Sequence, residues 1–165
     1  MKKYGYWIAF AVGLYVLQAS ILPLIAYHGI SPNLLMLLTV SFAFLHGARY
    51  GVLMGFCLGV LQDLATGTFF GVSVFSYMLL GIACGSFSNR VFKEQLFLPV
   101  LASIAATAVH YSILTGIMML MGYSFNLGMH IRNIFFPMMV YQLVFVYPVH
   151  RLAYSLEQYI REKKS

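Results

Sequence analysis

Asp63 is the residue whose chemistry fits its surroundings least. It is the only carboxylate among the first 93 residues, and it ends an apolar stretch in which Gly51, Gly55 and Gly59 recur at every fourth position. A carboxylate at membrane depth is costly, so it needs a partner and by default marks a functional or structural site. The chemistry that we expect here is hydrogen bonding or ion pairing between helices.

Two partners for Asp63 can be named from the sequence. Arg132 lies at the start of the last apolar segment, and Asn33 lies at the start of the second, where its amide could donate a hydrogen bond. Asp63 could then be a satisfied structural tether, or it could contact a ligand or a partner protein. A proton relay is not expected, because no second carboxylate within an apolar segment accompanies Asp63.

The glycines that precede Asp63 form one stripe along a helix, and Gly81 and Gly85 form a second stripe in the next apolar segment. In lipid there is no hydrophobic force between helices, so they associate through close backbone approach, which glycine permits. The row Gly51, Gly55, Gly59 therefore predicts a helix contact. The contact could lie within this chain, or it could receive a helix of another protein.

The remaining groups that could do chemistry are scattered. The histidines stand singly and lack the spacing of zinc ligands: His28, His46, His110, His130 and His150. His110 is expected to hydrogen-bond between helices, with Gln142 as its partner, and Cys57 and Cys84 are expected to be buried apolar residues. No nucleophile elbow, phosphate loop or pair of carboxylates is present. We therefore expect no catalytic residue, cofactor or metal, and no enzyme.

The composition predicts a single integral-membrane domain. Of the 165 residues, 61% are hydrophobic and 8% are charged, and the mean hydropathy is +0.84. Soluble domains carry about 25% charged residues. The net charge of +6 is attributed to membrane topology and not to nucleic acid. The apolar run that follows Lys2 and Lys3 is longer than the core of a signal peptide, so it is expected to be a retained first span.

Six apolar segments are predicted to cross the membrane: residues 4–22, 33–45, 50–65, 71–87, 97–121 and 133–148. The second, whose start is predicted at Ser31-Pro32, and the third fall short of about 20 residues. They could be tilted spans or a re-entrant hairpin. With the N-terminus in the cytoplasm, nine of the ten Lys and Arg residues lie in cytoplasmic parts and only Arg132 lies outside. This excess orients membrane proteins, so both termini are expected in the cytoplasm.

Residues 150–165 form a tail of different character. Glu157 and Arg161 are spaced to pair on a helix. One apolar face is predicted from four residues: Leu152, Leu156, Tyr159 and Ile160. The tail could continue the sixth span along anionic lipid, or it could be a docking helix for a cytoplasmic partner.

Several of these motifs together resemble the rod shape-determining protein family MreD. Asn33 stands where many members have an aspartate, and the resemblance covers essentially the whole chain. The motifs that carry it are Ser31-Pro32-Asn33-Leu34-Leu35, the series Gly51, Gly55-Phe56, Gly59, Asp63, Gly67 and Gly71, then Ser76-Tyr77 with Gly81 and Gly85, and the loop Asn89-Arg90-Val-Phe92-Lys93.

The resemblance implies a non-enzymatic scaffold in the bacterial cell inner membrane that maintains rod shape. Family members act in the lateral cell-wall elongation complex, where they bind MreC. They associate with the MreB filament and with the pair of a SEDS glycosyltransferase and a class B penicillin-binding protein. The implied fold is a compact all-α bundle of six transmembrane helices, similar to the substrate-binding subunit of energy-coupling-factor transporters.

Partner contacts or structural tethers are expected at six residues: Asn33, Gly51, Gly55, Gly59, Asp63 and Arg132. Two alternatives stay open. The chain could be the ligand-capturing membrane subunit of a vitamin-type importer, or it could bind a lipid-linked wall precursor through Arg132 or the cytoplasmic basic residues.

Overall fold

The computed structural model describes residues 2–26, 32–67, 70–88, 97–122 and 127–163, and all regular secondary structure in these ranges is helical. This confirms the all-α fold class. The six longer helices are α1 (Lys2–Ser20), α2 (Leu34–His46), α3 (Ala48–Thr66), α4 (Val72–Ser86), α5 (Phe97–Leu120) and α7 (Phe136–Glu162). Three short elements complete the list: a 3₁₀ turn (Leu22–Ile25), α6 (Leu127–His130) and a π-helical turn (Ile131–Phe135).

Helix α2 is the centre of the bundle. It packs against α1, α3, α4, α5 and α7, and every residue from Leu34 to Leu45 is buried. A helix that is apolar on all sides is typical of such a position. Its 13 residues span only about 20 Å, less than the thickness of a bilayer core of about 30 Å. Protein surrounds α2 on all sides, so its apolar side chains are covered by the other helices.

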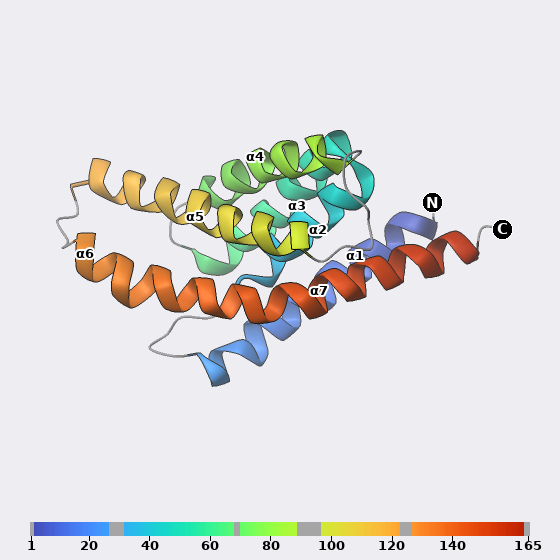
Figure 1. The fold of residues 1–165 in the computed structure, drawn as a ribbon, viewed down its shortest axis with the longest axis horizontal. Coiled ribbons are helices and arrows are strands. Elements are labelled where there is room, and N and C mark those ends of the chain that lie inside the picture. Colours follow the sequence, from blue (N-terminus) through green and yellow to red (C-terminus); the bar gives the residue numbers. More distant parts are fainter. Residues whose placement is uncertain (1, 27–31, 68–69, 89–96, 123–126, 164–165) are drawn as a thin grey trace.

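The two ends of the chain lie together at one end of the bundle (Figure 1). The rings of Tyr6 and Tyr159 meet edge to face with centroids 6.2 Å apart, and Lys163 Nζ donates a hydrogen bond to Tyr6 Oη at 3.1 Å. We call this the terminal end. The opposite end holds the start of α2 and the connection between α3 and α4. The chain therefore crosses the bundle an even number of times.

Two helices carry the length and hydropathy expected of membrane spans. Among the described residues, Gly5–Leu24 and Leu98–Leu120 are long and apolar enough to cross a membrane. Helices α2 and α4 are apolar but shorter. Helix α3 extends over 19 residues, because it begins directly after Gly47, two residues before the expected boundary.

The start of α2 differs from the prediction. The cap is Asn33 and not Ser31, which lies outside the described residues, and Pro32 comes just before the cap. An asparagine side chain can accept a hydrogen bond from one of the first free N–H groups of the helix, whereas proline has no side-chain acceptor.

The predicted sixth segment and the tail form one helix, α7, whose buried face differs from the predicted one. Leu152 and Tyr159 are 53% and 52% exposed, whereas Ala153, Glu157 and Ile160 are buried. Of the four residues of the predicted apolar face, Leu156 packs against the core and Ile160 is buried, and the buried stripe also holds the carboxylate of Glu157, which hydrophobicity alone does not predict. The pair of Glu157 and Arg161 is confirmed, with Arg161 Nε 3.0 Å from Glu157 Oε1.

Candidate functional site

Asp63 caps the start of helix α4. Its carboxylate is buried, and it accepts from the main-chain N–H groups of Gly71 at 2.7 Å, Ser73 at 3.0 Å and Val74 at 3.3 Å. The first four N–H groups of a helix lack partners inside the helix, and a carboxylate there also meets the positive end of the helix dipole. Asp63 therefore fastens the last turn of α3 to the first turn of α4.

Two glycines let the chain return to this carboxylate. Gly67 ends α3 with φ 63°, and its N–H donates to the carbonyl of Asp63 at 3.0 Å. Gly71 precedes α4 with φ 104°. Such positive φ values are open to glycine at little cost. The short connection can therefore bring α4 back beside α3.

The free N–H groups at the start of α2 also all have hydrogen-bond acceptors. The N–H of Asn33 donates to Gln142 Oε1 at 3.2 Å, and the N–H of Met36 donates to Asn33 Oδ1 at 3.0 Å. Between them, Leu34 and Leu35 donate to Gln18 Oε1 at 2.8 and 3.2 Å. Each buried N–H without a partner costs about 1–3 kcal/mol. All four free donors of α2 are thus occupied by amide side chains.

One glutamine joins the two capped helix starts. Gln18 Nε2 donates to Gln62 Oε1 at 2.9 Å, and Gln62 immediately precedes Asp63. We call the set Gln18, Asn33, Gln62, Asp63 and Gln142 the capping network. It connects α1, α2, α3, α4 and α7 at the opposite end of the bundle.

The sequence prediction overlooked the glutamines of this network. Gln142 was assigned to His110, but its described hydrogen bonds go to the main chain of Asn33. His110 lies instead beside Tyr77, with ring centroids 5.8 Å apart. A usable signal was present, because Gln18, Gln62 and Gln142 are single glutamines in three apolar segments, and buried amides require partners.

Arg132 lies outside the capping network. It is an exposed residue of the π-helical turn, and the hydrogen bonds described for Asp63 go to the main chain of α4. Naming Arg132 or Asn33 as the partner of Asp63 was therefore wrong. Main-chain donors satisfy the carboxylate better than one side chain could, because three of them converge on it.

The glycine row forms the contact between α3 and α4. A Cβ at Gly51 would lie 2.8 Å from the carbonyl oxygen of Gly81, and a Cβ at Gly59 would lie 2.5 Å from the Cα of Val74. A Cβ at Gly55 would collide with the carbonyl of Tyr77. Helix α4 therefore occupies this stripe, which leaves no room there for a helix of another protein.

A contact between His46 and Glu157 joins α2 to α7 at the terminal end. His46 Nε2 lies 3.1 Å from Glu157 Oε2, and the His46 ring stacks on Phe42 with centroids 4.2 Å apart. Arg161 bonds the other oxygen of Glu157. The last helix is thus fastened to the central one through the buried carboxylate of Glu157, which both basic side chains approach.

The described residues offer main-chain capping and close packing rather than reactive groups. Within them, no three His, Cys, Asp or Glu side chains come together as metal ligands would. Cys84 is buried as expected, but Cys57 is exposed on the outer face of α3, so the prediction for Cys57 was wrong. The chemistry of this site is the stabilisation of helix ends inside an apolar bundle.

A comparison with protein families gives a match over nearly the whole chain. The family model described as rod shape-determining protein MreD matches residues 1–160. No curated protein and no solved structure matches the chain significantly.

Proposed function

The chain belongs to the MreD family of rod shape-determining proteins, and from this premise we propose that it is a multi-pass scaffold of the cell-wall elongation complex. Family membership gives a role in rod shape determination and an association with the membrane. The proposed mechanism is contact: a rigid bundle holds its partners in place and carries out no reaction on them.

The capping network is the observation that carries this proposal. Asn33 and Asp63, which were expected to be partner contacts or tethers, and Gln18 all accept from main-chain N–H groups of α2 or α4. Groups used in this way fix helix positions and are not free to capture a ligand. The ligand-capturing importer alternative needs polar groups directed at a ligand, so the network favours the scaffold.

Charge supports an orientation with both termini in the cytoplasm. Arg49 lies at the start of α3, and Arg161 and Lys163 lie at the end of α7, near the terminal end, whereas Arg132 lies in the π-helical turn that precedes α7. Short cytoplasmic regions of membrane proteins are enriched in Lys and Arg. The proposed location is the bacterial inner membrane, with Arg132 on the periplasmic side.

The proposed fold relationship is to the substrate-binding subunits of energy-coupling-factor transporters. Its support is the arrangement of five longer helices around the short central helix α2. We treat the resemblance as one of architecture, because the ligand-binding function would need free polar groups that the capping network does not offer.

MreC is the proposed direct partner. Since α4 occupies the glycine row, a single span of MreC would pack on another lipid-facing surface. The periplasmic part of MreC would meet the opposite end, where Arg132 is exposed. The MreB filament is proposed as a less direct partner at the terminal end. The SEDS glycosyltransferase with its penicillin-binding protein is proposed to associate through MreC.

Co-purification in detergent tests this proposal. Tagged chain and MreC are co-expressed, and the yield of MreC per chain is measured for the wild type, for Arg132→Glu and for Arg151→Glu. Both arginines are exposed, but Arg132 lies in the π-helical turn before α7 and Arg151 lies well within α7, so we expect at least a fivefold loss only for Arg132→Glu. Absence of MreC from the wild-type preparation, with both proteins folded, would overturn the scaffold proposal.

A further inference from the structure

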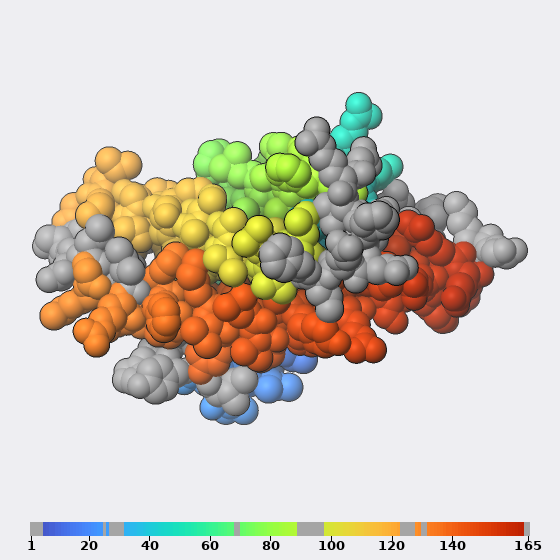
Figure 2. All heavy atoms as spheres, viewed as in Figure 1, coloured from blue at the N-terminus to red at the C-terminus, as the bar shows by residue number. Residues whose placement is uncertain are grey.

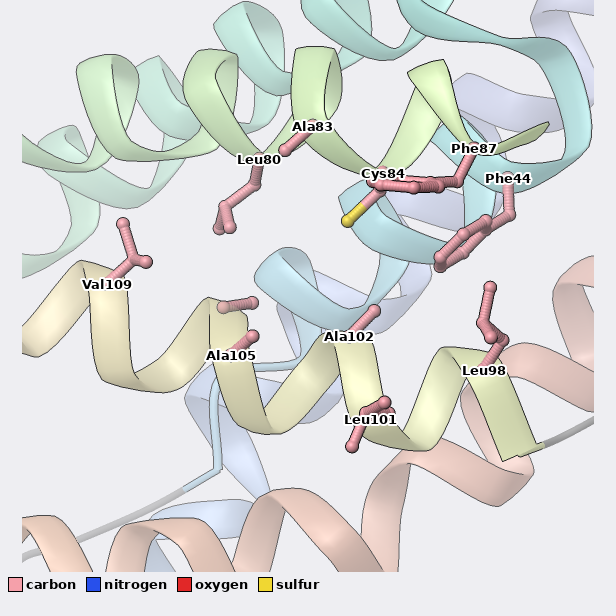
Figure 3. A pocket seen from close by; sticks show the side chains of 11 residues that line it. Phe44, Leu80, Ala83, Cys84, Phe87, Leu98, Leu101, Ala102, Ala105 and Val109 are labelled. Carbon is pink, nitrogen blue, oxygen red and sulfur yellow. The ribbon is translucent and has the colours of Figure 1, made fainter. Parts of the chain in front are cut away.

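An apolar groove runs between α4 and α5 over the end of α2 (Figure 3). Its volume is about 350 Å³, and no lining side chain is charged or carries a hydroxyl or amide group. Small residues create the hollow, because Ala102, Ala105 and Ala106 of α5 face Ala83 and Cys84 of α4. A ligand of this groove must itself be apolar along its length.

The groove is open on its outer side. Leu101 and Phe87 on its rim are 54% and 53% exposed, whereas Ala106 on its floor is buried. In a bundle surrounded by lipid, this opening faces hydrocarbon. The natural source of an occupant is therefore the bilayer itself and not the aqueous phase.

The dimensions favour a thin occupant. The lining of α5 extends from Leu98 to Val109, which corresponds to about 16 Å along a helix. A helix of that length and about 10 Å diameter would fill about 1,200 Å³, several times the volume of the groove. A hydrocarbon chain fits this long, narrow space, whereas the body of a partner's helix does not.

Charge at one end selects the kind of lipid. The groove ends at Phe44, Phe87 and Leu98, near the last turn of α4. There Gly85 packs against the backbone of Ala48, and the next residue is Arg49. Arg49 therefore follows directly after a residue that contacts the last turn of α4, at the end of the groove that faces the terminal end. Basic side chains at this depth attract anionic headgroups.

We propose that the groove between α4 and α5 binds one acyl chain of an anionic phospholipid, with the headgroup held near Arg49. The chain lies along α5 and fills the hollow left by the alanines. A methylene that enters the groove leaves lipid and not water, so it gains little from the hydrophobic effect. The selectivity must therefore come from shape and from the headgroup charge.

Photocrosslinking in nanodiscs tests the proposal. The full chain is reconstituted with a phosphatidylglycerol that carries a diazirine within one acyl chain, and labelled peptides are mapped by mass spectrometry. We compare Ala105→Phe, which fills the groove, with Ala9→Phe, which adds the same bulk to an exposed position of α1. The expected result is at least a fivefold loss of α5 labelling for Ala105→Phe and no change for Ala9→Phe.

The headgroup is tested with the same label on phosphatidylcholine and with Arg49→Gln. We expect at least threefold weaker α5 labelling in both cases. If Ala105→Phe does not fold, Val109→Phe on the rim of the groove replaces it. Equal labelling of α5 and of exposed α1 residues, equal labelling by the two lipids, or α5 crosslinked to another protein or to a second copy would each overturn the proposal.

Discussion

The carboxylate of Asp63 and the main-chain N–H of Gly71 are 2.7 Å apart, and this bond holds the end of one helix to the beginning of the next. The lone carboxylate of the first four apolar segments is thus a helix cap supplied by the preceding helix. Its partner lies only eight positions further along the chain. The site can therefore be disturbed without any change in the distant helices.

Asp63→Ala is expected to destabilise the protein, because three buried main-chain donors lose their acceptor. Loss of a cap and exposure of unsatisfied donors together cost about 2–3 kcal/mol. Thermal unfolding in detergent, followed by circular dichroism, measures the effect. Asp63→Asn keeps one acceptor oxygen, so it should retain part of the stability. Unfolding of Asp63→Ala at the wild-type temperature would show that the cap contributes nothing.

Gln18→Leu removes the acceptor of two N–H groups at the start of α2. Since those donors are enclosed by the bundle, we expect a loss of about 1–3 kcal/mol in the free energy of unfolding. Gln158→Leu is the matched control, because Gln158 is an exposed glutamine of α7. Equal stability of the two variants would contradict the role given to Gln18.

Glycine-to-alanine substitutions should have opposite effects in two helices. At Gly55 a new Cβ would collide with the carbonyl of Tyr77, so α3 and α4 must separate and the protein loses stability. At Gly13 a new Cβ meets nothing within 4 Å, so alanine should be neutral or stabilise α1 by up to about 1 kcal/mol. Unfolding temperatures of the two variants measure this. The same sign at both positions would refute the packing argument.

Lys163 is expected to keep its charge to higher pH than an ordinary lysine. Its hydrogen bond to the Tyr6 hydroxyl, with the nearby Tyr159, raises the pKa of the Lys163 ammonium. A raised pKa in the folded state means that the stabilising contact is fully present below the ordinary lysine pKa and is lost as pH rises through the raised value. Titration of the Lys163 Nζ signal by NMR measures this.

Tyr6→Phe removes that hydrogen bond and should lower the pKa of Lys163 toward its ordinary value. Tyr147→Phe serves as the control, because the Tyr147 hydroxyl accepts from Arg151 and not from Lys163. An unchanged pKa of Lys163 in Tyr6→Phe would show that the hydrogen bond to Tyr6 does not raise this pKa.

Composition and hydrophobic runs were sufficient to predict an all-helical protein, because these depend on short-range sequence alone. The importance of Asp63 was also predictable, since a lone carboxylate in an apolar stretch must have partners. Its actual partners were not, because main-chain donors leave no mark on the sequence. The same limit applied to Gln18, whose acceptor role depends on where α1 packs against α2.

The tail shows a second limit of prediction. The four apolar residues of the predicted face gave no sign that the buried face of α7 contains Glu157. A carboxylate is accommodated there because His46 and Arg161 approach it. Only the three-dimensional arrangement reveals that these side chains meet, as His46 is far from Glu157 along the chain.

The hydrogen bond between Asn33 and Gln142 determines when, during synthesis, the start of α2 can be completed. The acceptor for the first N–H of α2 lies 109 residues later in the chain, so a ribosome must synthesise nearly the whole protein before that helix start is complete. Until α7 is in place, the central helix carries an unfinished end. A chain truncated before α7 should therefore be recognised by membrane proteases as incomplete, even though five of its longer helices are already in place.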